Sequence, residues 1–236
     1  MNIIYKDSTE STNSDAKSLA RDGANEWTIV CARRQSSGRG RLGRTFFSPE
    51  GGLYMSIILR PTLKSDAVTL LTTAAAAAMS RAIEKLYNKR TNIKWVNDIF
   101  IDGRKVCGIL TESAFCGKDL DFAVVGIGVN LYGKKEQIPN ELANIMGFVC
   151  DSPTQREELI LTFLEFFREY YEKLADKPHL EYYKQKQIIK DTPVTVLEEE
   201  KEITAFAKGI DDNFHLCVET DGQERFLSFG EVSVRL

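Results

Sequence analysis

Residues 33–44 constrain the chain more than any other stretch, because they hold five arginines, three glycines and no acidic residue. A buried element cannot keep that much charge unpaired, so the stretch is expected to form a surface loop. Glycines let a backbone approach an anion closely, and arginines bind phosphate and carboxylate groups through paired hydrogen bonds. The stretch therefore predicts an anion-binding loop, with a merely solvated basic loop as the alternative.

Two glycine patterns are similar to nucleotide-binding motifs, and both are rejected. The glycines of residues 38–43 match G-x-G-x-x-G, but that motif needs a helix directly after the loop, and Thr45–Pro49 lead toward a strand. Residues 128–135 miss the phosphate-loop pattern, because Lys135 stands where Ser or Thr would bind magnesium.

The composition excludes several classes of protein. The 236-residue chain has a net charge of −3, which gives no overall attraction to nucleic acid. It shows no signal-peptide pattern and no apolar run long enough to span a bilayer. Five cysteines without C-x-x-C spacing predict reduced thiols in a cytoplasmic protein. His179 and His215 lie too far apart in sequence to favour a His-based triad or a tightly bound metal.

Hydrophobic periodicity predicts mixed strands and helices up to about residue 190. Helices are expected at 13–21, 65–88, 153–174 and 180–189, and strands at 2–7, 28–32, 53–59, 93–96, 99–101, 106–115 and 120–131. Short strands then follow at 193–197, 203–208, 214–219, 226–229 and 232–235. Such closely spaced strands predict a small SH3-like β-barrel, so we divide the chain into domains 1–190 and 191–236.

Three further stretches hold candidate functional residues, each with a structural alternative. Lys105 follows the Asp102-Gly103 turn and Asn97-Asp98 separates two apolar strands, which fits either a ligand site or an ordinary hairpin. The glycines of residues 126–130 indicate close approach of a ligand or of another part of the chain. Ser11-Thr12-Asn13 is typical of a helix cap and can also hold a polar ligand group.

Taken in order, these stretches resemble the biotin protein ligases over nearly the whole chain. The Gly-Arg-Gly-Arg loop with a later Lys-Trp-x-Asn-Asp segment is a specific combination. The resemblance implies an α+β fold, with a mixed sheet flanked by helices as a biotin/lipoate ligase-like catalytic domain, followed by a small C-terminal SH3-like β-barrel. The matching segments are Ser11–Asn13, Gln35–Arg44, Phe47–Pro49, Lys94–Asp98, Arg104–Leu110, Gly126–Asn130 and Gly230–Arg235.

The resemblance also implies a two-step reaction. Biotin and Mg-ATP form biotinyl-5′-AMP, and a lysine of a biotin carboxyl carrier protein domain, from acetyl-CoA carboxylase or a related carboxylase, then displaces AMP. ATP and Mg²⁺ are therefore expected with biotin as the substrate. Cations suit the first step, because two anions must meet. A closing glycine-rich loop can keep water from the mixed anhydride.

The resemblance implies three groups of site residues. The catalytic residues are Arg39, Arg41, Asp98 and Lys105, with Asp98 also as a candidate for organising Mg²⁺ through the phosphates. The biotin-binding residues are Ser11, Thr12, Asn13, Gln35, Gly38, Arg39, Gly40, Arg41, Lys105 and Gly108. The ATP- or adenylate-binding residues are Arg39, Arg41, Arg44, Phe46, Asn97, Lys105 and Asn130.

The sequence departs from the family pattern at two positions. Phe46 stands where the family often has a Trp beside the adenine. Val96 replaces a frequent Pro, which is expected to loosen the backbone before Asn97. Some members begin with a winged-helix DNA-binding domain, but here the biotin motif starts at Ser11, so DNA is not an expected partner. The net charge of −3 and the lack of a long apolar run make a membrane an unexpected partner as well. A homodimer is one alternative for the oligomeric state.

Three rival functions stay open at this point. A lipoate or octanoate protein ligase shares the fold, although the polar side chains of Ser11–Asn13 favour a ureido group over an alkyl chain. A nucleic-acid-binding module built on the arginine loop predicts steep salt dependence, and the net negative charge counts against it. A non-catalytic biotin-binding protein does not need so many arginines.

Overall fold

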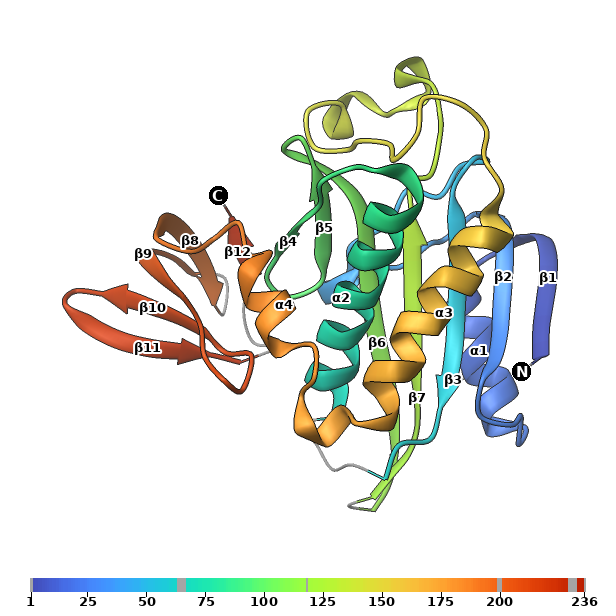
Figure 1. Cartoon of the computed structure of the whole chain (residues 1–236), viewed down its shortest axis with the longest axis horizontal. Helices are drawn as coiled ribbons and strands as arrows, with labels where there is room; N and C mark the ends of the chain where they lie inside the picture. The colour runs from blue at the N-terminus through green and yellow to red at the C-terminus, as the bar shows by residue number, and fades with distance from the viewer. Residues whose placement is uncertain (1, 63–66, 118, 199–200, 229–232, 236) are drawn as a thin grey trace.

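The computed structural model describes residues 2–62, 67–117, 119–198, 201–228 and 233–235. The larger of its two sheets has seven strands in the order β1-β2-β3-β7-β6-β5-β4 (Figure 1). The first two strands pair in parallel and the others antiparallel, so the predicted mixed sheet is confirmed. Its strands are Asn2–Thr9 (β1), Thr28–Gln35 (β2), Leu53–Leu59 (β3), Asn92–Lys94 (β4), Asp98–Ile101 (β5), Arg104–Cys116 (β6) and Asp119–Val129 (β7).

Helices cover both faces of this sheet, as Figure 1 shows. Helix α1 (Thr12–Arg21) packs on one face, against β2, β3 and β7, while α2 (Ala67–Tyr87) and α3 (Arg156–Glu172) pack side by side on the other face. The side chains of each strand alternate between these layers: Ile57 belongs to the core under α2 and Ile58 to the core under α1. The fully buried run Ala74–Ala78 lets α2 lie close to its neighbours.

Two predicted helix boundaries differ from the structure. Helix α3 begins at Arg156 and not at Pro153, because the backbone at Gln155 is still extended. Helix α4 (Leu180–Gln185) ends before the predicted Ile189. The reason is that the chain leaves the helix to pair with β4, whose Ile93 N–H donates to the Lys186 carbonyl at 2.7 Å. The predicted cap at Ser65 or Asp66 lies outside the described residues.

The second sheet forms a small C-terminal β-domain, defined here as strands β8 to β12. All of its pairings are antiparallel, in the order β11-β10-β9-β8-β12. The prediction of five short strands is therefore confirmed, whereas the domain boundary at residue 190 stays a prediction. The strands are Thr192–Glu198 (β8), Lys201–Ile210 (β9), Leu216–Thr220 (β10), Gln223–Leu227 (β11) and Ser233–Arg235 (β12).

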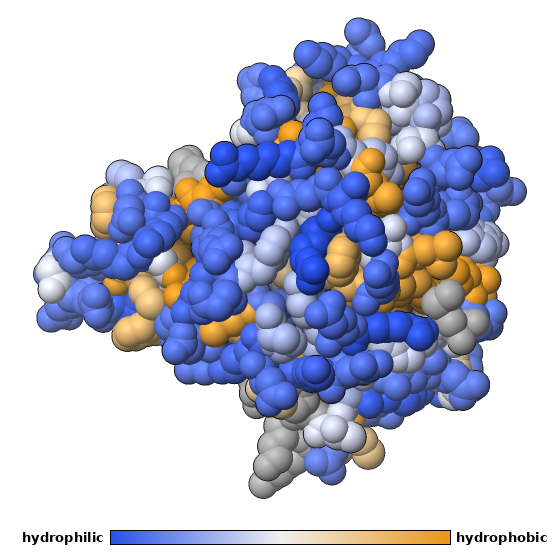
Figure 2. Space-filling model, viewed as in Figure 1, coloured by the Kyte–Doolittle hydropathy of each residue, from blue (hydrophilic) through white to orange (hydrophobic). Residues whose placement is uncertain are grey.

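The face of the molecule that carries α2 and α3 presents mostly hydrophilic side chains (Figure 2). None of the described helices combines the length and the apolar character that a bilayer crossing requires.

Candidate active site

A cleft lies on the α1 face of the large sheet. Its walls come from the N-terminus of α1, the end of β2, the loop after β2, the β4–β5 connection and the facing strands β6 and β7. Five described cationic side chains line it against a single described carboxylate, that of Asp98. The cleft is therefore a strongly positive site in a chain of negative net charge. The cations are Arg39, Arg41, Arg44, Lys94 and Lys105.

One end of the cleft carries small polar side chains held in fixed orientations. Ser11 caps α1, where its Oγ accepts a hydrogen bond from the Ser14 N–H. The Thr12 N–H donates to Gln35 Oε1 at 2.8 Å, and Gln35 Nε2 donates to Ser48 Oγ at 2.9 Å. These bonds orient the Gln35 amide, so the predicted biotin-binding residues Ser11, Thr12 and Gln35 do lie together.

Asn13 is fixed by two residues that the sequence analysis missed. Its Nδ2 donates to Glu112 Oε2 at 2.9 Å, and its Oδ1 accepts from Ser56 Oγ at 2.6 Å. Burial opposes ionisation of Glu112, but hydrogen bonds from Lys17 and Asn13 outweigh it and lower the pKa of Glu112. Ser56 could have been identified from the sequence, since it is a polar residue inside the largely apolar strand β3.

The glycines of β6 and β7 make room for side chains from other parts of the chain. A Cβ on Gly126 would lie 2.0 Å from Asn13 Oδ1, and one on Gly128 would lie 2.5 Å from Phe46 Cε1. Gly108 pairs with Gly128 across the two strands, and a Cβ there would lie 3.0 Å from Phe46 Cε2. Phe46 therefore rests on a hollow between two strands, and the predicted close approach is made by the chain itself.

The loop of residues 38–46 folds back as a small hairpin over the cleft. The Gly40 N–H donates to the Arg44 carbonyl at 2.7 Å, and the Phe46 N–H donates to the Gly38 carbonyl at 2.8 Å. Arg41 reaches inward, where its Nη1 donates to Asn97 Oδ1 at 3.3 Å. Burial lowers the pKa of the Arg41 guanidinium, and the negative charge of Asp98 opposes that effect.

Lys105 lies where the sequence places it, but it is not a solvated side chain. Asp102 and Gly103 take left-handed φ values of 48° and 74°, so the predicted tight turn is present. Lys105 Nζ lies 2.7 Å from Asp98 Oδ1 and 5.8 Å from the centroid of the Phe46 ring. The side chains of this ion pair are only 26 % and 22 % exposed, which keeps the ammonium in one place at the cationic end of the cleft.

Two predicted ligand-binding residues lie outside the cleft lining. Gly38 begins the 38–46 loop, and a Cβ at this position would lie 2.4 Å from the Phe46 carbonyl oxygen. The missing side chain therefore allows the two ends of the hairpin to come together. Asn130 lies behind Lys105, and its Nδ2 donates to the Lys105 carbonyl at 3.2 Å. Asn130 thus supports the strand that carries Lys105, and the nucleotide contact expected of it stays a prediction.

Val96 does not loosen the backbone before Asn97, contrary to the sequence-based expectation. Its side chain is fully buried, and its carbonyl accepts a hydrogen bond from the Tyr183 hydroxyl at 3.0 Å. The preceding Trp95–Val96 peptide is cis. Packing thus holds this wall of the cleft in place without the frequent proline. Asn97 lines the cleft, as predicted.

The fold and the cleft agree with the class to which the sequence belongs. Residues 5–130, more than half of the chain, match the Biotin/lipoate A/B protein ligase family. The chain therefore belongs to this family. Within that class, residues 191–235 match the Biotin protein ligase C terminal domain.

Both known relatives and solved structures are similar to this chain, among them the following two relatives and one structure. The bifunctional ligase/repressor BirA of Bacillus subtilis is 36% identical over 176 residues, which is 71% of this chain and 54% of that protein. The biotin--[acetyl-CoA-carboxylase] ligase of Mycobacterium tuberculosis is 26% identical over 95% of this chain and 85% of its own length. The structure of biotin protein ligase from Aquifex aeolicus in complex with biotin and ATP has a TM-score of 0.84 and 28% identity, and covers 99% of this chain and 98% of that chain. This chain spans about half the length of the BirA relatives from Bacillus.

Proposed function

We propose that this protein is an ATP-dependent biotin ligase, which activates biotin as biotinyl-5′-AMP and transfers the biotinyl group to a lysine of a biotin carboxyl carrier domain. The observation that carries the proposal is the division of one cleft into two ends. One end holds neutral polar groups, and the other brings five cations together with one carboxylate. Biotin has a neutral ureido ring and a carboxylate, and ATP adds a triphosphate, so the two substrates match both ends.

The polar end recognises the ureido group. A ureido group offers two N–H donors and a carbonyl acceptor. Gln35 and Asn13 have amide groups whose orientations are set by Thr12, Ser48 and Glu112. Gln35 Nε2 keeps one N–H and Asn13 Oδ1 one acceptor position beyond these protein bonds, and a ureido group can use both whereas an alkyl chain can use neither.

The cationic end supports the first chemical step. A carboxylate oxygen of biotin attacks the α-phosphorus of ATP, and the bond from that phosphorus to the pyrophosphate oxygen breaks. Arg39, Arg41 and Lys105 neutralise the carboxylate and the phosphate as they approach, and they stabilise the charge that develops on the phosphate oxygens. Lys105 is held by Asp98 before the substrates arrive, so little reorganisation is needed.

The second step transfers the biotinyl group to the carrier. The carrier lysine arrives as an ammonium and first gives one proton to solvent. The neutral amine then attacks the carbonyl carbon of the mixed anhydride, the bond from that carbon to the AMP oxygen breaks, and the nitrogen gives a second proton to solvent as AMP leaves. Asp98 is the described carboxylate in the cleft and therefore the group that attracts the incoming ammonium. The 38–46 loop covers the intermediate and keeps water away from it.

Magnesium fits this cleft only as a companion of ATP. No three described His, Cys, Asp or Glu residues are grouped so that they could hold a metal ion. Asp98 can bind the ion only with help from the phosphates, because its Oδ1 already faces Lys105. Bound there, magnesium would neutralise charge on the triphosphate.

The proposal also covers the domain bounds, the protein partner and the cellular compartment. The catalytic domain comprises residues 1–190 and the C-terminal domain residues 191–236, supported by the separate sheets and the family match at 191–235. The partner is a carrier domain of acetyl-CoA carboxylase or a related carboxylase, supported by the name of the Mycobacterium tuberculosis relative. All five cysteines are free thiols, which supports a reducing compartment such as the cytoplasm.

Intact-mass measurement tests the proposal. The protein is incubated with Mg-ATP, biotin and an isolated carrier domain, and we expect the carrier to gain one biotinyl group only when ATP is present. Parallel reactions with lipoate and octanoate test the main alternative within the family. Transfer of either acid without transfer of biotin would overturn the assignment.

A further inference from the structure

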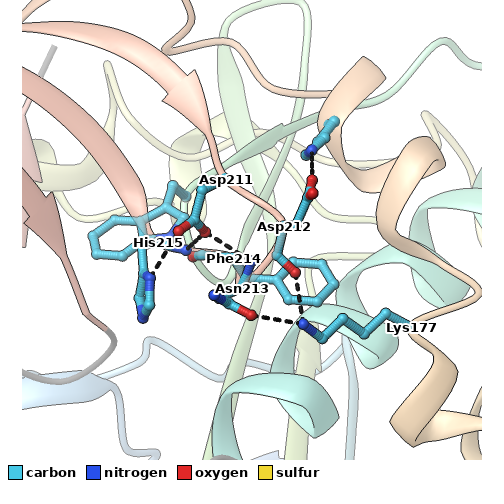
Figure 3. A network of polar contacts seen from close by, with 8 residues as sticks. Lys177, Asp211, Asp212, Asn213, Phe214 and His215 are labelled. Carbon is cyan, nitrogen blue, oxygen red and sulfur yellow. Dashed lines mark hydrogen bonds and ion pairs between the residues drawn. The ribbon is translucent and has the colours of Figure 1, made fainter.

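A turn of the C-terminal β-domain is tied firmly to the catalytic part of the chain. Residues 211–215 connect β9 to β10, and Asp211 Oδ1 accepts the N–H groups of Asn213 and His215, each at 2.8 Å. Figure 3 shows how Lys177 reaches this turn: its Nζ donates to the Asp212 carbonyl and to Asn213 Oδ1, each at 2.7 Å. Lys184, from α4, donates to Asp212 Oδ1 at 2.5 Å. Three separate contacts therefore anchor the turn.

The same turn inserts Phe214 between side chains of the catalytic part. The Phe214 ring is fully buried and stacks on the His179 ring, with centroids 4.8 Å apart and planes 10° from parallel. It meets the Tyr183 ring edge-on at 5.4 Å. Phe214 adopts a left-handed φ of 61°, which a side chain rarely adopts, so packing must over-determine its position.

Phe214 is connected directly to the wall of the cleft. Its carbonyl accepts a hydrogen bond from Trp95 Nε1 at 2.8 Å, and Trp95 lines the cleft. Tyr183, which packs on Phe214, donates its hydroxyl to the Val96 carbonyl at 3.0 Å. The Phe214 carbonyl and the Tyr183 hydroxyl thus bind Trp95 and Val96, the two residues that precede Asn97 and Asp98.

The polar end of the cleft has separate supports. Ser11–Asn13 belong to α1 and its cap, and Gln35 ends β2. The side chains that orient them come from β3, β6 and Ser48, so Phe214 bonds to none of them in the described structure. A change at Phe214 should therefore reach the nucleotide end and leave the biotin end in place.

We propose that Phe214 is a positioning residue for the nucleotide end of the cleft, acting through Trp95. The C-terminal β-domain then shapes the ATP site although Phe214 itself does not contact ATP. The turn of residues 211–215 positions Trp95, and Trp95 in turn positions the β4–β5 connection that carries Asn97 and Asp98. The inference rests on the proposed function for the identity of the nucleotide.

Trp95 itself can report on the contact, because the chain has only two tryptophans. In a Trp27→Phe background, fluorescence comes from Trp95 alone. We expect Phe214→Ala to shift the Trp95 emission to longer wavelength, since loss of the ring admits water to the indole. Phe226→Ala is the matched control, because Phe226 lies in the same domain and is 57% exposed, and it should leave the emission unchanged.

Ligand binding separates positioning from general destabilisation. We expect Phe214→Ala to weaken nucleotide binding by about tenfold, because small displacements in a site have large effects. Titration calorimetry measures this with biotin present and an ATP analogue whose α,β-bridging oxygen is replaced by a methylene group, so that no adenylate forms. Biotin affinity in the absence of ATP should change less than about twofold, since the groups at that end keep their supports. Phe214→Leu keeps an apolar side chain and provides the comparison if the alanine variant does not fold.

Three outcomes decide the proposal. An emission shift with a selective loss of ATP affinity supports it. Unchanged ATP affinity in a folded variant, or equal losses for ATP and biotin, would overturn it. If the unmodified protein binds ATP but releases no biotin-dependent pyrophosphate, the proposed function fails while the comparison of ATP affinities still decides the role of Phe214.

Discussion

For Lys105, the structure changes the expected effect of a substitution on the free energy of unfolding. As a turn-flanking surface side chain, its loss would cost within about 0.5 kcal/mol of unfolding free energy. The structure instead pairs it with Asp98 at 2.7 Å in a partly buried position. Removing the lysine takes away the cation in direct contact with the partly buried Asp98 carboxylate, so the substitution affects both folding and chemistry.

We predict that Lys105→Ala lowers the unfolding free energy by about 1–2 kcal/mol, because the Asp98 carboxylate loses its partner. Adenylate formation, followed as biotin-dependent pyrophosphate release, should fall at least about 100-fold, because a cation at developing charge is worth about 3 kcal/mol in the transition state. Lys105→Arg should rescue the activity poorly, since a planar guanidinium does not replace a compact ammonium.

The double variant Lys105→Ala with Asp98→Asn is the control for stability. It removes the Asp98 charge that has lost its direct partner, so urea unfolding should recover part of the lost free energy while pyrophosphate release stays low. If Lys105→Ala, alone or with Asp98→Asn, released pyrophosphate nearly as fast as the unmodified protein, Lys105 would not be a catalytic residue.

The two glycines of β7 allow a second prediction. Gly126→Ala places a methyl group against Asn13, and Gly128→Ala places one against Phe46. We expect Gly126→Ala to weaken biotin binding and Gly128→Ala to weaken ATP binding, each by about tenfold, because displaced groups at a site lose their geometry. Titration calorimetry with each ligand measures the split.

Phe46→Leu combined with Gly128→Ala serves as the control, because a smaller side chain can share the hollow with the new methyl group. Partial recovery of ATP binding is expected. If Gly128→Ala weakened biotin and ATP equally, the assignment of the two glycines to separate ends of the cleft would be wrong.

At the scale of elements, the 38–46 loop is the part of the cleft with the weakest support. Two backbone hydrogen bonds close the hairpin, and Leu42 at its tip is 61% exposed with a left-handed φ of 53°. Its arginines repel one another until an anion arrives. A loop with few buried contacts opens readily, so its closure is expected to depend on ligand.

We predict that amide hydrogens of residues 36–46 exchange quickly in the free protein and become protected when biotin, or biotin with ATP, is bound. Hydrogen exchange read by mass spectrometry measures this change. Peptides from α2, whose helix is buried in the core, should show the same protection in all states and provide the internal control. Equal protection of the loop with and without ligand would contradict the prediction.

At the scale of the whole molecule, one hydrophobic core joins the large sheet to the C-terminal β-domain. Phe214 and Val218 of that domain belong to the same buried cluster as Ile57 and the α2 alanines. His179 lies fully buried at this junction, against Phe214. Burial lowers the pKa of His179 to about 3, so the folded protein keeps this imidazole neutral at mild acidity.

We therefore predict a loss of stability as the pH falls below the ordinary histidine pKa of about 6.5. The unfolded chain takes up a proton on His179 between about pH 6.5 and pH 3, and the folded chain does not, so the unfolding free energy decreases by up to about 1.4 kcal/mol per pH unit in this window. Thermal unfolding between pH 7 and pH 5 measures the slope above the range where most carboxylates titrate.

His179→Phe should reduce this slope, because phenylalanine keeps a stacked ring and cannot be protonated. Thr73 keeps a hydrogen bond after the change, since its hydroxyl also donates to the Thr69 carbonyl at 2.9 Å. His215→Gln is the matched control and should retain the His179 contribution to the slope. An unchanged slope in His179→Phe would assign the pH dependence to other groups.

The sequence determined the elements and the chemical character of the site. Alternating and helical apolar patterns are local properties, so they predicted the strands of the large sheet and the five short strands after residue 190 within a few residues. The arginine-rich loop and the Asp102-Gly103 turn are also local, because unpaired charge and left-handed backbone restrict what a short segment can form.

Tertiary structure alone decided which of these groups meet. Asn130 and Gly38 belong to family-like motifs, yet neither is among the described residues that line the cleft. The partners of Asn13 and Trp95 are Glu112 and Phe214, which lie 99 and 119 residues away in sequence. No local pattern encodes such pairs, because their distance depends on how sheet register, helix packing and the C-terminal β-domain bring separate segments together.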